Sequence, residues 1–115
     1  MKESIILDKS MNFAVRAVKL YKHLSERKSE YVMSKQMLRS GTSIGANARE
    51  ALQGQSKADF TAKMSIALKE SVETEYWLEL LYRTGYLSDK AYESISRDNQ
   101  ELSKILTAIV KTSRT

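Results

Sequence analysis

The stretch from Ser56 to Gly85, SKADFTAKMSIALKESVETEYWLELLYRTG, decides the fold. Ser56 can cap a helix, and Asp59 follows three residues later, as in a capping box. Gly85 can end the helix, because glycine readily takes the left-handed conformation that follows a last turn. Between these residues, apolar and small side chains recur at helical spacing: Phe60, Met64, Ala67, Ser71 and Leu78. The stretch therefore predicts one helix of about 28 residues, the longest in the chain.

Three further helices are predicted around this one from their hydrophobic period. The first runs from about Asp8 to Arg27, and the charged, aperiodic segment 25–31 is a loop. The second is capped by Ser34 and continues to about Gln53, and the fourth opens at Ser88 and Asp89 and ends near Thr112. Because the connections are short, the sequence predicts an all-α, antiparallel up-down-up-down four-helix bundle. Residues 1–115 form a single domain.

Composition supports this fold class. The 115 residues are 42% hydrophobic and 29% charged, with no proline and four glycines, which is typical of packed helices. The absence of cysteine excludes disulfides, thiolate metal sites and a cysteine nucleophile. The N-terminal apolar cluster, residues 5–7, is too short for a signal peptide, and no run of about 18 apolar residues occurs. We expect a cytoplasmic protein that does not bind membranes.

The first predicted helix combines a wide apolar arc with a basic face. The arc contains Met11, Ala14, Val15, Val18 and Tyr21, flanked by Phe13, Ala17, Leu20 and Leu24. The basic face, called the basic ridge below, consists of Lys9, Asn12, Arg16, Lys19, His23 and Arg27. Residues 1–57 hold 11 Lys/Arg against 5 Asp/Glu, and residues 58–115 hold 8 against 9. An anionic partner should therefore meet the first half, although the ridge is also interpretable as a face that is simply solvated.

The second predicted helix carries small residues and a polar stripe. Gly41 and Gly45 indicate close packing, because glycine inside a helix costs about 1 kcal/mol relative to alanine. The partner is either another helix of the same bundle or a second subunit. The polar stripe has spacings of four, three, four and three and consists of Gln36, Ser40, Ser43, Asn47 and Glu50. It is a seam between helices, a solvated face or a ligand-binding strip.

The segment from Tyr76 to Tyr82 is apolar around the whole predicted third helix. If Met64, Leu68, Val72, Leu78 and Tyr82 face the core, the opposite side of the helix carries Ile66, Trp77 and Leu80. An exposed apolar patch of this kind usually marks a protein interface. The sequence therefore predicts self-association through this patch, unless the loops or the N-terminal segment cover it.

Candidate catalytic and metal-binding groups form no pattern. Ser43 has no histidine near it in the sequence, and the one histidine, His23, lies on the first helix. Glutamates crowd the third helix at Glu70, Glu73, Glu75 and Glu79. A di-iron bundle needs a Glu-x-x-His pair on each of two helices, which one histidine cannot supply. We expect Glu75 or Glu50 to meet an arginine or a hydroxyl instead, because an unpaired buried carboxylate is costly.

Two segments carry a family resemblance. The first is Gln36-x-x-Arg39-Ser40-Gly41-Thr42-Ser43-Ile44-x-x-Asn47-x-x-Glu50. The second is Glu73-Thr74-x-Tyr76-Trp77-Leu78, with Asp59-Phe60, Ile66-Ala67-Leu68-Lys69-Glu70 and Gly85-Tyr86 around it. Together they resemble the four-helix-bundle family named after proteins encoded by 23S ribosomal RNA intervening sequences. The resemblance covers nearly the whole chain, with Ala48 and Arg49 standing where many members have isoleucine and alanine.

This resemblance implies a homopentameric ring, as in the similar accessory proteins of diversity-generating retroelements, which engage nucleic acid and a reverse transcriptase. The family itself has no established molecular function. We therefore predict a non-enzymatic, homo-oligomeric interaction module without cofactor, metal or small-molecule substrate. The leading role is contact with RNA or a nucleoprotein through Lys9, Arg16, Lys19, Arg27 and Arg39. The alternative is a protein-binding scaffold with no nucleic-acid role.

Overall fold

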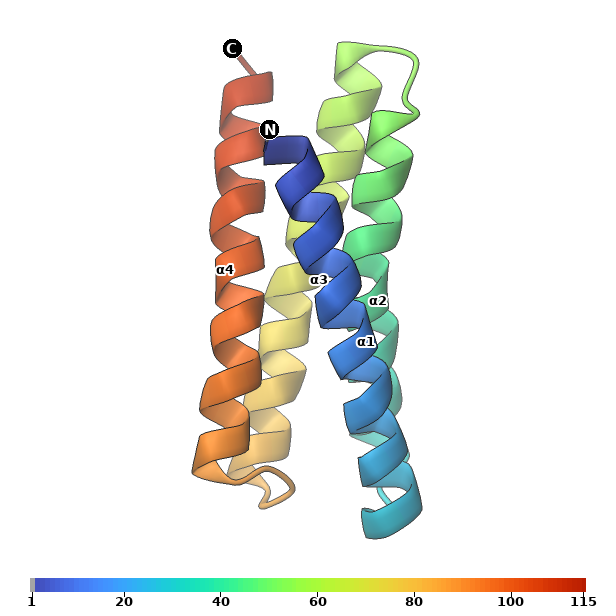
Figure 1. The fold of residues 1–115 in the computed structure, drawn as a ribbon, viewed down its shortest axis with the longest axis vertical. Helices are drawn as coiled ribbons and strands as arrows, with labels where there is room; N and C mark the ends of the chain where they lie inside the picture. The colour runs from blue at the N-terminus through green and yellow to red at the C-terminus, as the bar shows by residue number, and fades with distance from the viewer. Residues whose placement is uncertain (1) are drawn as a thin grey trace.

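Four helices pack side by side along a common axis (Figure 1). The computed structural model describes residues 2–115, with side chains from Ile5 onward. The helices are α1 (Lys2–Lys28), α2 (Val32–Leu52), α3 (Lys57–Arg83) and α4 (Asp89–Ser113). Figure 1 shows α1 and α3 running one way along the 44 Å axis and α2 and α4 running the other. The predicted all-α, up-down-up-down bundle is confirmed.

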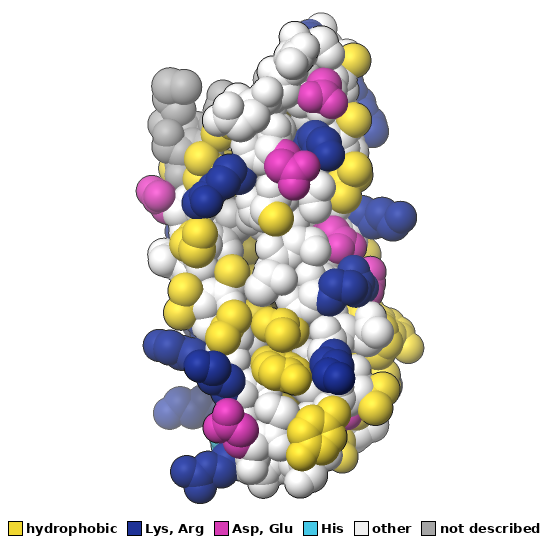
Figure 2. All heavy atoms as spheres, turned by 90° about the vertical axis from the view of Figure 1, so that its right-hand side faces the viewer, with side chains coloured by type: hydrophobic (Ala, Val, Ile, Leu, Met, Phe, Trp, Pro, Cys, Tyr) yellow, Lys and Arg dark blue, Asp and Glu magenta, His cyan; other side chains and the backbone are white. Residues whose placement is uncertain are grey.

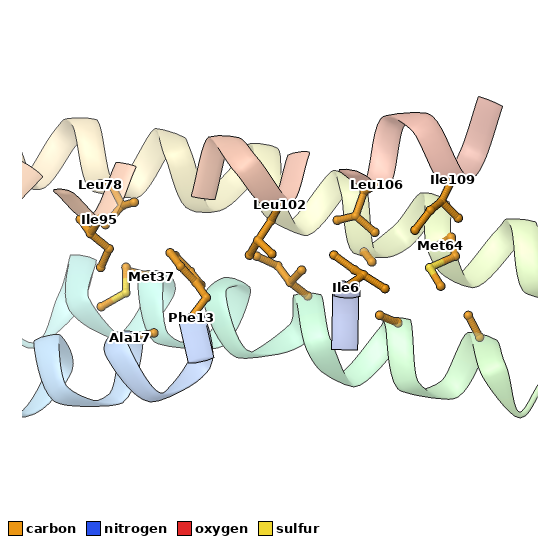
Figure 3. Packing of buried hydrophobic residues seen from close by; sticks show 14 of the residues in the cluster. Ile6, Phe13, Ala17, Met37, Met64, Leu78, Ile95, Leu102, Leu106 and Ile109 are labelled. Carbon is orange, nitrogen blue, oxygen red and sulfur yellow. The ribbon is translucent and has the colours of Figure 1, made fainter. Parts of the chain in front are cut away.

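One hydrophobic core fills the space between the helices (Figure 3). Each helix contributes fully buried side chains to it, among them Phe13, Met37, Leu78 and Leu102. Burying a side chain of this size contributes about 1.5–3 kcal/mol to stability. Neighbouring helices make contact in the order α1, α2, α3, α4 and back to α1, and the α1–α4 seam is the least extensively packed.

The caps of α3 and α4 lie where the sequence predicts them. The Ser56 hydroxyl accepts a hydrogen bond from the Asp59 N–H, and the Ser88 hydroxyl accepts one from the Ala91 N–H, both at 3.1 Å. Gly85 has a positive φ of 88° just after α3, which is the left-handed conformation expected of it. Gly85 and Ser88 therefore fix the two ends of the loop that joins α3 to α4, and Ser56 fixes the start of α3.

The predicted start of α1 and the predicted cap of α2 are wrong. α1 begins at Lys2 and continues to Lys28, through part of the segment expected to be a loop. α2 begins at Val32, and its cap is the Glu30 carboxylate, which accepts hydrogen bonds from three backbone N–H groups, those of Val32, Met33 and Ser34, at 2.7 to 3.1 Å. Ser34 instead donates its hydroxyl to the Glu30 carbonyl at 2.7 Å. A glutamate can therefore cap a helix from two residues before its first turn.

The core face of α1 is also rotated from the predicted arc. Phe13, Ala17 and Leu24, expected as its flank, are fully or almost fully buried. Met11, Val15 and Val18, expected at its centre, are 38 to 47% exposed. The arc was too wide to orient the helix, because apolar residues surround more than half of it.

On α3, the prediction that Val72 faces the core is also wrong, since its side chain is 61% exposed. The small residues Ser71 and Thr74 take its place in the core and are fully buried. Met64 and Leu78 are buried as predicted, whereas Leu68 and Tyr82 are only partly buried. Ser71 belongs to the predicted helical series and Thr74 does not, so hydrophobic periodicity detects only part of the buried face of α3.

The close packing predicted at the two glycines of α2 lies within one chain. A Cβ added at Gly41 would lie 3.2 Å from the Cβ of Ala17, and one added at Gly45 would lie 3.0 Å from the hydroxyl oxygen of Ser10. Both neighbours belong to α1, so α1 and α2 approach closely there. Larger residues would push these two helices apart.

Candidate functional site

Half of the predicted nucleic-acid contacts on α1 are tied to α4. The Lys9 ammonium lies 3.2 Å from the Glu101 carboxylate, and the Arg16 guanidinium lies 2.6 Å from the Asp98 carboxylate. Arg16 also donates to the carbonyl and the hydroxyl of Ser94. These two cations therefore bridge the α1–α4 seam, and each would have to leave its partner to bind a phosphate.

The remaining ridge cations, Lys19 and Arg27, are exposed. Neither forms an ion pair with any residue from Ile5 onward. Lys19 lies beside Arg16 at a shallow hollow between α1 and α4 that Leu87 and Ile95 also line. Only this part of the basic ridge offers cations without an acidic partner among the described residues.

Arg39, the predicted contact on α2, is held by α3. Its guanidinium forms ion pairs with Glu70, at 3.2 Å, and with Glu73. Glu73 also accepts the indole N–H of Trp77 at 3.0 Å, and Gln36 accepts the Arg39 Nε–H at 3.3 Å. Several of the motif residues therefore form one connected polar group across the outside of α2 and α3.

The polar stripe of α2 lies along the same α2–α3 seam. Ser40 is fully buried and accepts the Thr74 hydroxyl at 2.8 Å, and Glu50 pairs with Lys63 at 3.0 Å. Ser43 and Asn47 bond to carbonyls of their own helix. Of the three interpretations of the stripe, the contacts favour the seam between helices, and they leave the Ser43 hydroxyl without a histidine partner.

A second polar network joins α3 to α4. The Glu75 carboxylate accepts hydrogen bonds from Tyr92, Ser96 and Asn99 at 2.7 to 3.1 Å. Asn99 is fully buried and exchanges hydrogen bonds with Ser71 at 2.9 Å. Burial raises the pKa of Tyr92, the Ser96 hydroxyl lowers it by less, and the nearby Glu75 carboxylate raises it further. The expectation that Glu75 meets hydroxyl groups is confirmed.

The candidate functional site consists of two exposed apolar strips. The α1 strip is Met11, Val15 and Val18, and the α3 strip is Ile66, Val72 and Tyr76, exposed by 42, 61 and 60%. The other two predicted interface residues, Trp77 and Leu80, are half-buried, and Trp77 packs against the core. Figure 2 shows hydrophobic side chains exposed among lysines and arginines on the face that α1 and α2 present. Exposed apolar patches often mark protein interaction sites.

The described residues contain neither a cluster of metal-ligating side chains nor a membrane-spanning helix. No three His, Asp or Glu side chains among residues 5–115 are placed to hold a metal ion. None of the helices within residues 2–115 has the length and apolar character needed to cross a membrane.

These motifs and this bundle are found in known proteins. The family described as 23S rRNA-intervening sequence protein matches residues 2–108. The chain belongs to this family. A crystal structure of a protein of unknown function from the S23 ribosomal protein family of Bacteroides thetaiotaomicron has 60% sequence identity and a TM-score of 0.95. The match covers 96% of this chain and 99% of that one. No curated protein matches.

For this member of the 23S rRNA-intervening sequence protein family, sequence reasoning identified one of the three residues of the α3 strip and none of the α1 strip as interface. Ile66 was predicted, whereas Val72 and Tyr76 were not. The signal that would have found them is the pair of buried hydroxyl residues Ser71 and Thr74, because each fixes the direction of its neighbours. Small polar residues beside a fully apolar segment are thus informative about helix rotation.

Proposed function

We propose that this protein is a non-enzymatic interaction module that assembles head to tail with copies of itself. The α1 strip of one copy would pack against the α3 strip of the next. The observation that carries the proposal is the presence of exposed apolar strips on two helices, α1 and α3, that lie diagonally across the bundle. Strips on opposite sides favour a contact between unlike surfaces, which closes into a ring when the rotation permits.

The heights of the two strips support this pairing. A Cβ added at Gly41 would lie 3.2 Å from Ala17 and 3.8 Å from Thr74, so these two residues lie at one level of the bundle. Val15 and Val18 flank that level on α1, and Val72 and Tyr76 flank it on α3, within about one helical turn of 5.4 Å. Because α1 and α3 run in the same direction, rotation about an axis parallel to the bundle would bring the strips together without sliding. The family resemblance supports a pentameric ring.

Light scattering coupled to gel filtration tests the proposal. Wild type should elute as a closed oligomer, and Val72→Glu/Tyr76→Glu should elute as a monomer, because a carboxylate buried in an apolar contact is costly. Both side chains are exposed in the single chain, so the variant should keep its helical circular dichroism. Arg97→Glu, on the exposed side of α4, is the matched control and should keep the wild-type mass. A monomeric wild type at micromolar concentration would contradict the proposal.

A second candidate function is RNA contact through the basic ridge. Lys19 and Arg27 favour it, because both are exposed and neither is paired to a residue from Ile5 onward. A symmetric assembly would repeat these cations, so that weak contacts add. Lys19→Gln/Arg27→Gln should then weaken binding of a labelled single-stranded RNA. An unchanged affinity would favour the alternative, a protein-binding scaffold without a nucleic-acid role.

A further inference from the structure

The surface shared by α3 and α4 near the end of α4 carries cations and hydroxyls. Two adjoining shallow hollows there share Ser65 and Arg114 in their linings. Their cations are Lys57, Lys69, Lys111 and Arg114, and their hydroxyls come from Thr61, Ser65, Thr107 and Ser113. We call this surface the α3–α4 groove. No aspartate or glutamate is among the described residues that line it.

The groove differs from the basic ridge in how its cations are paired. Its four cations are all exposed, and none forms an ion pair within the described chain. Lys104, two turns before Lys111 on the same side of α4, is likewise exposed and outside the ion pairs. The charge of the groove is therefore available to a ligand without breaking a contact in the protein.

The absence of acids from the groove results from the rotation of the helices. Residues 58–115 hold more acids than bases, yet Glu70 and Glu73 turn toward Arg39 on α2. Asp98 and Glu101 turn toward α1, where they pair with its cations. The half of the chain that is acidic in sequence thus presents a basic surface in the fold.

We propose that the α3–α4 groove binds the phosphate backbone of a nucleic-acid strand. Ammonium and guanidinium groups bind phosphates, and the hydroxyls beside them can donate further hydrogen bonds. From Lys104 to Arg114 the row of cations extends about 15 Å along α4, which exceeds the spacing of several backbone phosphates at about 3.4 Å of axial rise each. The lining holds no aromatic side chain, so bases would not be stacked and binding would be largely independent of sequence.

An acidic protein partner fits the groove less well. Protein interfaces centre on buried aromatic or large apolar anchors held in pockets. The groove offers only Leu68, which is partly buried, and Val110, which is 5% exposed and faces the core. A row of closely spaced anions fits the groove better, because it requires hydrogen-bond donors and cations but no apolar pocket.

The groove and self-assembly can be tested separately. Helix α4 carries neither apolar strip, so substitutions there should leave the oligomer intact. The groove variant is Lys104→Gln/Lys111→Gln, and the matched control is Lys35→Gln/Lys90→Gln, which removes the same charge from exposed positions outside both the groove and the basic ridge. Light scattering shows whether each variant keeps the wild-type mass.

Fluorescence anisotropy with a labelled single-stranded RNA, between about 50 and about 200 mM salt, measures the contacts. We expect the log–log salt slope of the groove variant to shrink by about 1.4, since each single-strand phosphate contact contributes about 0.7. The control should keep the wild-type slope. The two proposals can fail independently. If wild type is a monomer and the salt slope shrinks only in the groove variant, the groove is supported and self-assembly is contradicted.

Three results would overturn the inference: no RNA binding by wild type at low salt, an unchanged slope in the groove variant, or an equal loss in both variants. Equal loss would mean that net charge, not this surface, attracts RNA. Binding to anionic lipid vesicles without binding to RNA would also overturn it, because a membrane would then be the occupant.

Discussion

Helix α4 is held by polar side chains on both of its seams, but the two seams differ in burial. On the α3 side, Ser71 and Asn99 are fully buried and every hydrogen bond of Asn99 stays within the bundle. On the α1 side, the side chains of Arg16 and Asp98 are 38 and 46% exposed. If one partner were lost from the α3–α4 seam, the buried polar groups left behind would have no hydrogen-bond partner. In the α1–α4 seam, water can take the place of a lost partner.

This difference teaches that burial, and not the number of polar contacts, decides their energetic weight. An unsatisfied buried group costs about 1–3 kcal/mol, but an exposed ion pair contributes about 0–1 kcal/mol. The buried network is also directional, because Asn99 meets Ser71 and Glu75 only when α3 and α4 are in register. The α3–α4 seam should therefore resist sliding and opening more than the α1–α4 seam does.

The largest expected effect comes from Asn99→Ala, which breaks the buried side of the comparison. The change removes the donor to Glu75 and the Ser71 carbonyl, and the acceptor of the Ser71 hydroxyl. We expect the free energy of unfolding to fall by about 3 kcal/mol, because more than one buried group loses its partner. Urea denaturation measures it, with the exposed neighbour Arg97→Ala as control. A loss equal to that of the control would contradict the argument from burial.

An intermediate effect is expected at Glu30, which is buried but lies on neither seam. Burial alone would raise the pKa of its carboxyl, but hydrogen bonds from the backbone N–H groups of Ser34, Met33 and Val32 outweigh it and lower the pKa below 4.5. Because the folded pKa is the lower one, the stabilisation is present above pH 4.5 and is lost as the pH falls through the folded value. Glu30→Ala should cost about 1–2 kcal/mol near neutral pH.

The pH dependence separates this cap from a general effect of acid. Thermal unfolding of wild type and Glu30→Ala is measured at neutral pH and near pH 3, about one unit below the ordinary carboxyl pKa. The two melting temperatures should converge in acid. A difference that stays constant between the two conditions would assign the loss to packing and not to the charged cap.

The smallest expected effect is that of Arg16→Gln, which tests the exposed side. Its ion pair with Asp98 is solvent-exposed, so the free energy of unfolding should fall by at most about 1 kcal/mol. The loss should shrink further as salt is added, because screening weakens the wild-type pair. A cost as large as that of Asn99→Ala would show that the α1–α4 seam depends on this bridge, and the comparison would fail.

Helix positions could be predicted from the sequence because their signals are local. Ser56, Ser88 and Gly85 act on the adjacent turn, so their roles do not depend on the rest of the fold. Glu30 was missed because a glutamate before a helix is not among the usual capping residues, and its role depends on a loop that folds its carboxylate back onto α2.

Helix rotation and charge pairing could not be predicted in the same way. Apolar residues surround α1 and the end of α3, so periodicity alone did not separate the core face from the exposed strips. The partners of Arg16 are 78 to 82 positions away in sequence, and no local pattern relates them. For the same reason, the buried role of Asn99 was invisible, since a polar residue on a helix is normally interpreted as solvated.

The uneven packing of the bundle has a consequence for its folding kinetics. The α2–α3 seam is the most extensively packed and is closed by a loop of four residues, 53–56, between the two helices. Local contacts form early because closing a short loop costs little conformational entropy. We expect this hairpin to be structured in the transition state and α1 to join α4 afterwards. Closure of the α1–α4 seam would then be the last step, so chains that are still folding would not yet have paired Lys9 and Arg16 with the acids of α4.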